Sequence, residues 1–518
     1  MARGKPRAAK PAGNIKRLFI ANRGEIALRI ARTASRLGLE VCAGFSSVDG
    51  GLPHLRLCDW ACELPGDPAR VYLDIGTVIS AARKAKADAI HPGYGFLSEN
   101  EEFADAVERA GMRFVGPTAA QIALLGDKLS AREAAVKAGV PVVPGVQRAV
   151  DTLEQASAIA ANIGFPLLIK AAGGGGGRGM RVVRQEDELA DALARASSEA
   201  DAAFGDARVF IEKYIQSVRH VEIQILGDGR GRAVALGERE CSVQRRHQKL
   251  IEESPAPALS RAAAHKMGEL AARLAAQVKY RGAGTMEFLV PGGSNDFYFI
   301  ETNTRLQVEH PVTEMRSGLD LVEEQLAIAA GRGFSARLTE ALGSRASAVN
   351  YSRLHGHAIE ARVIAEDADN DFRPSCGKLS MAAWPAGPGV RVDGWAEAGL
   401  EVSPFYDSLL GKVIAWGQDR EQARTRLVTA LRETLIHPVS NTAQFLAEIL
   451  EGKPFQTGDY DTSLLGQMRT RETDADMELQ LAGLAATELL NQRARFSAGE
   501  YAARPLSAWQ QADAQEQA

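Results

Sequence analysis

The segment that most constrains the fold lies at 165–183 and reads FPLLIKAAGGGGGRGMRVV. It holds six glycines between two apolar runs, and Lys170 stands at the end of the first run. Because glycine has no Cβ, the backbone N–H groups of such a loop can close on a polyphosphate, and the loop can move as a lid. The alternative is a flexible hairpin tip, which so many glycines would destabilise. We therefore predict two strands joined by a phosphate-binding loop.

This loop differs from two common nucleotide-binding motifs. Lys170 precedes the glycines, and the GK[ST] sequence of a Walker A loop occurs nowhere in the chain. A GxGxxG match exists at Gly174, Gly176 and Gly179, but a strand is expected after it instead of the helix of a dinucleotide-binding unit. The first turn of the chain, Asn22 to Gly24, also lacks spaced glycines. A nicotinamide cofactor is therefore not indicated.

The N-terminal part predicts a parallel α/β unit. From Ile15 the chain reads as a strand, a turn NRGE, a helix to about Leu37 and a second strand LEVCAGFSS. A second glycine-containing loop, HPGYGFLSEN at 91–100, follows a predicted strand and precedes a helix predicted at 101–110. Loops at the carboxyl ends of parallel strands are where such sheets bind ligands. The expected fold class is α/β with a doubly wound first domain.

Composition excludes several classes of protein. The 518 residues carry 61 Lys plus Arg against 65 Asp plus Glu, so there is no basic excess to hold a nucleic acid. No apolar run approaches the roughly 20 residues that span a bilayer, and no membrane association is expected. The five cysteines are scattered and no pair has C-x-x-C spacing, which predicts a reducing, cytoplasmic location.

Two acidic residues predict a metal site. A hairpin closed through PGGSND can bring Glu287 opposite Glu301, and strand alternation puts Asn303 on the face of Glu301. Facing carboxylates destabilise a sheet unless a cation lies between them, and these oxygen ligands suit Mg²⁺ (or Mn²⁺) bound to nucleotide phosphates. The alternative is a solvated polar face with lysine partners.

A dense group of charges predicts an anion pocket. It comprises ERECSVQRRHQK at 238–249 and the alternating residues Arg305, Gln307 and Glu309. If extended, the last three would point the same way and surround a small anion. Glu309 would then be a plausible general base if burial keeps its pKa within working range. The alternative for any one of these charges is a surface ion pair.

The order of these motifs adds a resemblance to a known family. NRGEIALRI, HPGYGFLSEN, KAAGGGGGRGMRVV, RHVEIQ, RRHQKLIEE, EHPVTE and YDSLLGK follow one another between Ile15 and Lys453. In this respect the chain resembles the biotin carboxylases, a branch of the ATP-grasp enzymes. The resemblance implies ATP- and bicarbonate-dependent carboxylation of biotin, the first half-reaction of acyl-CoA and related carboxylases. It also implies a fold with a doubly wound (Rossmann-like) first domain, a mobile α+β lid and a C-terminal mixed α+β domain.

The predicted organisation follows from the composition and the resemblance together. We expect a disordered basic arm at 1–14, an N-terminal domain at 15–127, the first ATP-grasp part with its glycine-rich lid at 128–214, the second part with the metal and bicarbonate site at 215–345, a C-terminal domain at 346–458, and a linker with an amphipathic tail at 459–518.

Site residues follow from the resemblance position by position. It assigns the catalytic roles to Glu309, Arg305, Lys249 and Arg362. It assigns ATP binding to Lys128, Lys170, Gly175, Gly176, Gly177, Glu212, Lys213, Ile215, His220, Gln244 and His247. It assigns bicarbonate binding to Lys249, Arg305, Gln307, Val308 and Glu309, with Glu309 as the base, biotin to Arg362, and the metal to Glu287, Glu301 and Asn303.

Partners are also implied. No lysine follows Lys453, so the C-terminal end offers no site for biotin attachment. We therefore expect a separate biotin carboxyl carrier protein and a carboxyltransferase subunit. The family also implies a homodimer. The alternatives are another ATP-grasp ligase that joins a carboxylate to an amine, or a scaffold protein without catalysis. One departure from the family is the order Asn441–Thr442, where Thr–Asn is usual.

Overall fold

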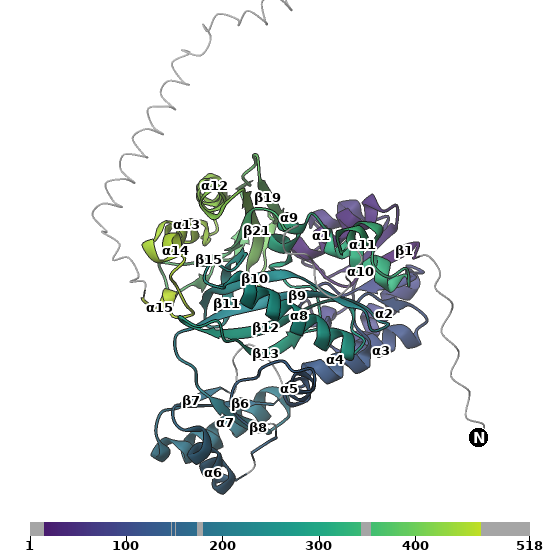
Figure 1. The fold of residues 1–518 in the computed structure, drawn as a ribbon. Coiled ribbons are helices and arrows are strands. Elements are labelled where there is room, and N and C mark those ends of the chain that lie inside the picture. The colour runs from purple at the N-terminus through teal and green to yellow at the C-terminus, as the bar shows by residue number, and fades with distance from the viewer. Residues whose placement is uncertain (1–14, 147, 151, 173–179, 343–353, 468–518) are drawn as a thin grey trace, which may run out of the picture. The chain divides into compact units, whose positions relative to one another are not determined.

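The computed structural model describes residues 15–467, apart from 147, 151, 173–179 and 343–353 (Figure 1). The predicted basic arm at 1–14 therefore lies outside the described residues, as does the part of the predicted linker and amphipathic tail from 468 onward. Among the described helices, none combines the length and the apolar character that a bilayer crossing requires.

The first sheet has five parallel strands in the order β3-β2-β1-β4-β5. Helix α1 (Gly24–Arg36) follows β1 directly, and Gly24 adopts a φ of +62° at the turn, a conformation that favours glycine. The strand order reverses between β1 and β4, so the loops after these two strands lie at the switch point where such sheets bind ligands. This confirms the doubly wound prediction. The strands and the other helices are β1 (Arg17–Ile20), β2 (Glu40–Phe45), β3 (Trp60–Glu63), β4 (Ala89–His91), β5 (Arg113–Phe114), α2 (Ile75–Lys84) and α3 (Glu101–Arg109).

A small α+β unit follows helices α4 (Ala119–Gly126) and α5 (Lys128–Lys137). Its antiparallel sheet has the order β7-β6-β8, formed by β6 (Leu167–Ala171), β7 (Arg181–Val183) and β8 (Val209–Lys213). Helices α6 (Leu153–Ile163) and α7 (Leu189–Phe204) contribute apolar residues to the same core as the strands, and the unit lies at the bottom of Figure 1. The strands on both sides of the glycine run are thus present, whereas Gly175, Gly176 and Gly177 lie outside the described residues.

The largest sheet among the described residues has eight strands, in the order β13-β12-β9-β10-β11-β14-β21-β19. All its pairs are antiparallel. Strand β14 pairs with β11, so one sheet runs through the boundary predicted at 345/346. The strands are β9 (Val218–Asp228), β10 (Ala233–Arg245), β11 (Gln248–Ser254), β12 (Arg281–Pro291), β13 (Tyr298–Asn303), β14 (His357–Ile364), β19 (Val390–Gly394) and β21 (Leu409–Gly417).

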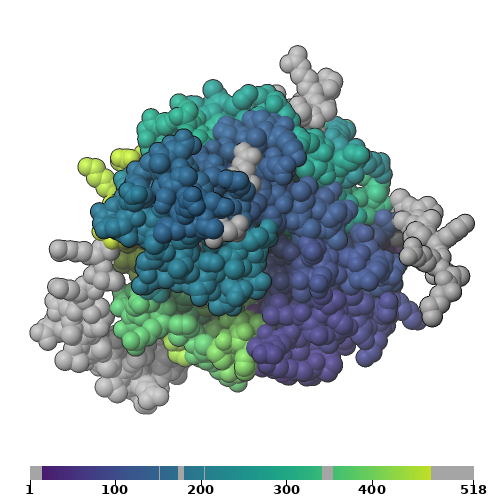
Figure 2. Space-filling view, turned by 90° about the horizontal axis from the view of Figure 1, so that it is seen from below, coloured from purple at the N-terminus to yellow at the C-terminus, as the bar shows by residue number. Residues whose placement is uncertain are grey.

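Helices cover this sheet. Helix α8 (Arg261–Gln277) contributes its apolar residues to the core beneath β9, β10 and β12. At the other end, α12 (Arg420–Glu433) and α13 (Ala443–Glu451) pack on β14 and β21. Tyr406 of this C-terminal region donates to the carbonyl of Pro68 at 2.7 Å. Figure 2 accordingly shows the purple N-terminal surface beside the green C-terminal surface.

Candidate functional site

Two carboxylates face each other across the β12·β13 hairpin. Glu287 pairs with Glu301, and Thr285 pairs with Asn303 two positions along. This is the register that strand alternation and the PGGSND turn predict. Both carboxylates therefore project from one face of the sheet.

Glu287 accepts hydrogen bonds from several neighbouring side chains. Its Oε1 accepts from Lys249 Nζ and from Asn303 Nδ2, both at 2.9 Å, and its Oε2 lies 2.8 Å from Nε2 of His220. Burial acts to raise the pKa of Glu287, but the charges of Lys249 and His220 outweigh it and hold that pKa well below its usual value. Glu287 is therefore a carboxylate anion with cationic neighbours.

The pKa of Glu301 is shifted in the opposite direction. Its pKa is raised by burial and by the charge of Glu287, while the ammonium of Lys128 lies 4.0 Å away. A like-charged pair of this kind fits a divalent cation, which would relieve the repulsion between the two oxygen ligands. His220, Glu222 and Glu287 form another group of possible metal ligands. Glu287 belongs to both this group and the pair with Glu301.

The segment 305–309 is not extended. Glu309 is the residue before helix α9 (His310–Ser317), and Pro311 stands in the first turn of that helix, where proline is favoured. The predicted alternation of Arg305, Gln307 and Glu309 along a strand is thus wrong. Arg305 and Gln307 nevertheless meet, since Nη1 of the former donates to Oε1 of the latter at 3.1 Å.

Glu309 lies between two cations. It is fully buried, its Oε1 accepts from Lys249 Nζ at 2.7 Å, and its Oε2 accepts from Arg362 Nη2 at 3.0 Å. Burial raises the pKa of Glu309, but Lys249, Arg362 and Arg239 together hold it well below its usual value. With both cations on the carboxylate, this pKa is lower than that of a general base working near neutral pH.

A buried cluster surrounds Glu212 on strand β8. Lys170 Nζ lies 2.7 Å from Glu212 Oε2, and Arg132 bonds the other carboxylate oxygen. Lys128 begins helix α5, and burial is the main cause of its lowered pKa. Lys213 donates instead to the backbone carbonyls of Gly164 and Phe165, at 3.1 and 2.8 Å.

Gln244 and His247 lie where β10 turns into β11. The turn residues Arg246 and His247 have φ values of +48° and +67°, which non-glycine residues rarely adopt. His247 is exposed, whereas Gln244 and Ile215 are half-buried.

Two residues that sequence reasoning missed contact the charged groups around Glu309. Glu99, in the loop after β4, accepts from Arg305 Nε at 2.8 Å and from the backbone N–H of Thr304 at 2.9 Å. Glu222 accepts from Lys249 at 2.7 Å. The sequence held a signal for each of these residues. Glu99 lies in the loop predicted to bind ligands, and Glu222 shares a strand face with His220.

The C-terminal part also reaches the site. Lys412 is fully buried on β21, opposite Arg362 in the strand pairing. Its Nζ donates to the carbonyl of Val308 at 2.7 Å and lies 3.2 Å from Glu25. Lys412 thus connects the Val308 backbone with Glu25 of helix α1.

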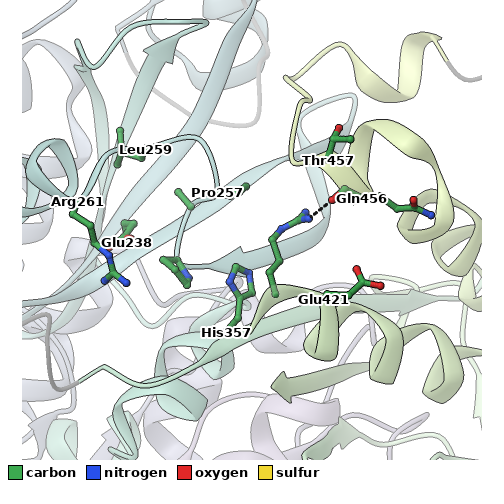
Figure 3. A pocket seen from close by; sticks show the side chains of 11 residues that line it. Glu238, Pro257, Leu259, Arg261, His357, Glu421, Gln456 and Thr457 are labelled. Carbon is green, nitrogen blue, oxygen red and sulfur yellow. Dashed lines mark hydrogen bonds between the residues drawn. The ribbon is translucent and has the colours of Figure 1, made fainter. Parts of the chain in front are cut away.

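A pocket of about 460 Å³ lies apart from this cluster, and Figure 3 shows Arg261, His357 and Glu421 around it. Its lining residues His357 and Arg420 bind Glu253, at 2.6 Å and at 2.8 and 2.9 Å. Glu253 follows Glu252 on β11, so the two side chains point to opposite faces of the sheet. Since Glu252 pairs with Arg362, the pocket is on the face away from Glu309.

Comparison with protein families matches three consecutive parts of the chain. Residues 14–122 match the biotin carboxylase N-terminal domain, 127–337 match the ATP-binding domain of the carbamoyl-phosphate synthase L chain, and 360–467 match the biotin carboxylase C-terminal domain.

Individual relatives agree with these matches. The chain is 48% identical over 454 residues to a biotin carboxylase of Nostoc sp., covering 87% of this chain and 99% of that protein. It is 43% identical over 463 residues to a subunit of the pyruvate carboxylase of Methanothermobacter thermautotrophicus, covering 89% and 91%.

Solved structures give the same result. A Campylobacter jejuni biotin carboxylase in complex with β,γ-ATP superposes with a TM-score of 0.83 at 42% identity, covering 88% of this chain and 99% of that one. The biotin carboxylase domain dimer of Hydrogenobacter thermophilus 2-oxoglutarate carboxylase, in complex with MgADP, ADP and bicarbonate, gives 0.82 at 40% identity, covering 88% and 98%.

Proposed function

Because this chain belongs to the biotin carboxylase family, we propose that it uses ATP to activate bicarbonate and then carboxylates a biotin carried on a separate protein. One observation carries this proposal above the others. A buried carboxylate, Glu309, contacts both Lys249 and Arg362, and Lys249 also contacts Glu287 of the facing acid pair. An anion site, a base and a metal site thus adjoin one another.

The nucleotide end of the site is assigned to the lid and the acid pair. Lys128 and Lys170 supply positive charge for the phosphates, and His220 lies beside Glu287. Glu287, Glu301 and Asn303 would hold Mg²⁺, which when bound neutralises charge on the phosphate oxygens. Gly175, Gly176 and Gly177 would close on the phosphates through their backbone N–H groups.

The bicarbonate end is assigned to Lys249, Arg305, Gln307 and the Val308 backbone. Glu309 takes the proton of bicarbonate, whose oxygen attacks the γ-phosphoryl group to give carboxyphosphate and ADP. Carboxyphosphate breaks down to CO₂ and phosphate, and the phosphate takes the ureido proton of biotin. Arg362 stabilises the resulting enolate while the ureido nitrogen attacks CO₂.

The low pKa of Glu309 is compatible with these reaction steps when the negative charge of the bound substrate is taken into account. Lys249 and Arg362 lower that pKa through their direct contacts with the carboxylate. A bound anion that takes part of the hydrogen bonding of Lys249 weakens its hold on Glu309, and the pKa of the carboxylate rises toward working range.

Two other functions are weighed against this one. An ATP-grasp ligase acting on an amine would share Lys170, Glu287 and Glu301 but would not respond to biotin. A scaffold without catalysis would not need Glu309, Arg305 and Lys249, which here are present and joined to one cluster. Neither explains why Arg362 reaches the base.

The test is the rate of ATP cleavage by the purified chain with bicarbonate, with and without free biotin. We expect cleavage that requires bicarbonate and is stimulated by biotin. Cleavage that depends on an amine, or that ignores both bicarbonate and biotin, would contradict the proposal.

The expected partners are a biotin carboxyl carrier protein and a carboxyltransferase subunit, and the chain is expected to form a homodimer. One relative is named as a subunit of pyruvate carboxylase and one solved relative as a domain dimer, which supports both expectations. All five cysteines are free, which supports a cytoplasmic location. Co-purification with a biotinylated carrier and the mass in solution test the partner and dimer expectations.

A further inference from the structure

Thr442 stands immediately before helix α13 but does not cap it. A threonine at this position usually accepts a hydrogen bond from the first turn of its own helix. Here its side chain makes no such bond. The Oδ1 of Asn441 accepts instead from the N–H of Ala443, at 3.1 Å. The hydroxyl of Thr442, which is fully buried, is thereby free to bond elsewhere.

That hydroxyl bonds to the strand that carries Arg362. It donates to the carbonyl of Arg362 at 3.1 Å and accepts from the N–H of Ile364 at 3.0 Å. The backbone N–H of Thr442 also donates to the carbonyl of Ile364, at 3.1 Å. Two groups of Thr442 therefore satisfy three backbone groups of β14.

These three groups lie where β14 loses a neighbour. Strand β11 pairs with β14 only as far as Ala361, opposite Ile251. On the other side, the β21 pairing places Lys412 opposite Arg362 and becomes irregular between Val363 and Ile364. Buried backbone groups without partners cost free energy, so Thr442 replaces the missing strand just where the Arg362 side chain leaves the sheet.

We propose that Thr442 is a positioning residue for biotin carboxylation, because it holds the backbone from which Arg362 reaches Glu309. This inference rests on the proposed role of Arg362 in the reaction. The guanidinium spans from Glu252 to Glu309, so a small shift of its backbone changes both contacts. Misplacing a reacting group by about 1 Å can cost about 100-fold in rate.

Asn441 and Thr442 contact different elements. The amide of Asn441 serves the helix, and the shorter, β-branched hydroxyl of Thr442 serves the strand.

The experiment replaces Thr442 by Val, which keeps the shape and removes the hydroxyl, and by Ser, which keeps the hydroxyl. The matched control is Thr434→Val, since Thr434 is also buried in the C-terminal region and its hydroxyl donates to a backbone carbonyl, that of Ala430 at 3.0 Å. We expect Thr442→Val to lower kcat/KM for biotin by about tenfold or more. We expect its KM for ATP to stay within about twofold, because the lid and the acid pair are untouched.

Thr442→Ser is expected to keep most of the wild-type kcat/KM for biotin, and Thr434→Val to keep all of it even if its melting temperature falls. Equal values for Thr442→Val and the wild type, or equal losses in the two Val variants, would overturn the proposal. If Thr442→Val does not fold, Thr442→Ala and Thr442→Ser are compared, and equal kcat/KM values in these two would overturn it. Failure of the proposed function is a separate result, because the wild type itself would then show no stimulation by biotin.

Discussion

Nζ of Lys249 lies 2.7 Å from Oε1 of Glu309, and the same ammonium lies 2.7 Å from Glu222 and 2.9 Å from Glu287. One cation is therefore shared by three buried carboxylates. These carboxylates raise the pKa of Lys249 well above its usual value, against the effect of burial. Under the proposed assignment, a bicarbonate ion bound here would compete with Glu309 for Lys249, so that bicarbonate binding would be linked to the activation of Glu309.

Replacing Glu309 by Gln should abolish this activation. The amide has nearly the shape of the carboxylate but cannot accept the proton of bicarbonate. General base catalysis contributes about 100-fold to 10,000-fold, so we expect bicarbonate-dependent ATP cleavage to fall by about 100-fold or more. The affinity for ATP, measured by nucleotide titration, should stay within about twofold of the wild type.

Glu433→Gln, on the exposed end of α12, is the matched control for this change. It removes one carboxylate far from the cluster and should leave both quantities unaltered. A Glu309→Gln variant with near-normal bicarbonate-dependent turnover would show that another group takes the proton.

Glu99→Gln should weaken bicarbonate binding. Glu99 accepts from Arg305 Nε at 2.8 Å and thereby orients the guanidinium assigned to bicarbonate. Without that ion pair the guanidinium can turn away, and we expect the KM for bicarbonate to rise by about tenfold, a loss typical of a hydrogen bond to a charged group. Steady-state kinetics with varied bicarbonate at saturating ATP measure it. Glu101→Gln, two residues along at the exposed start of α3, should behave as the wild type, and equal effects of the two changes would contradict the assignment.

Local patterns explain which parts of this site the sequence could predict. The facing of Glu287 and Glu301 follows from strand alternation and a short turn, and both signals lie within one hairpin. The pairing of Glu99 with Arg305 joins residues 206 positions apart, and no local pattern encodes such a contact. It depends on how the first sheet packs against the second.

The same reasoning applies to the segment before α9. Its polar and apolar residues alternate like those of a strand, but β13 ends at Asn303, and Pro311 stands in the first turn of helix α9, where proline is favoured. The sequence Glu309–His310–Pro311 could therefore have predicted the start of this helix. The pairing of β11 with β14 could not have been predicted in this way, because pairing between distant strands is decided by tertiary packing.

Glu301→Gln should separate metal binding from folding. The change removes one of two facing negative charges, so stability without Mg²⁺ should be unchanged or higher. Fewer anionic ligands bind the cation less tightly, and we expect about tenfold more Mg²⁺ for half-maximal thermal stabilisation in the presence of ADP. Thermal unfolding at a series of Mg²⁺ concentrations measures this shift. Glu186→Gln, an exposed acid in the lid region, is the control, and an unchanged Mg²⁺ requirement in Glu301→Gln would contradict the assignment.

His54 predicts a loss of stability in acid. Its side chain is fully buried, and among the described residues neither ring nitrogen has a hydrogen-bond partner. Burial lowers the pKa of His54 to about 4, from its ordinary value of 6.5. The folded state therefore excludes a proton that the unfolded chain binds. The contribution of His54 to the free energy of unfolding is therefore complete above pH 6.5. It is lost as the pH falls toward 4, because the unfolded chain then takes up a proton that the folded chain does not.

Replacing His54 by Leu should remove this pH dependence. At pH 5 the unfolded wild type gains about 2 kcal/mol from protonation of this histidine, which a leucine cannot supply. The free energy of unfolding, measured by denaturant titration at pH 7.5 and at pH 5, should therefore fall by about 2 kcal/mol less in His54→Leu than in the wild type. His437→Gln, at an exposed imidazole, should retain the wild-type dependence. A pH dependence in His54→Leu as steep as that of the wild type would mean that His54 is already protonated in the folded protein.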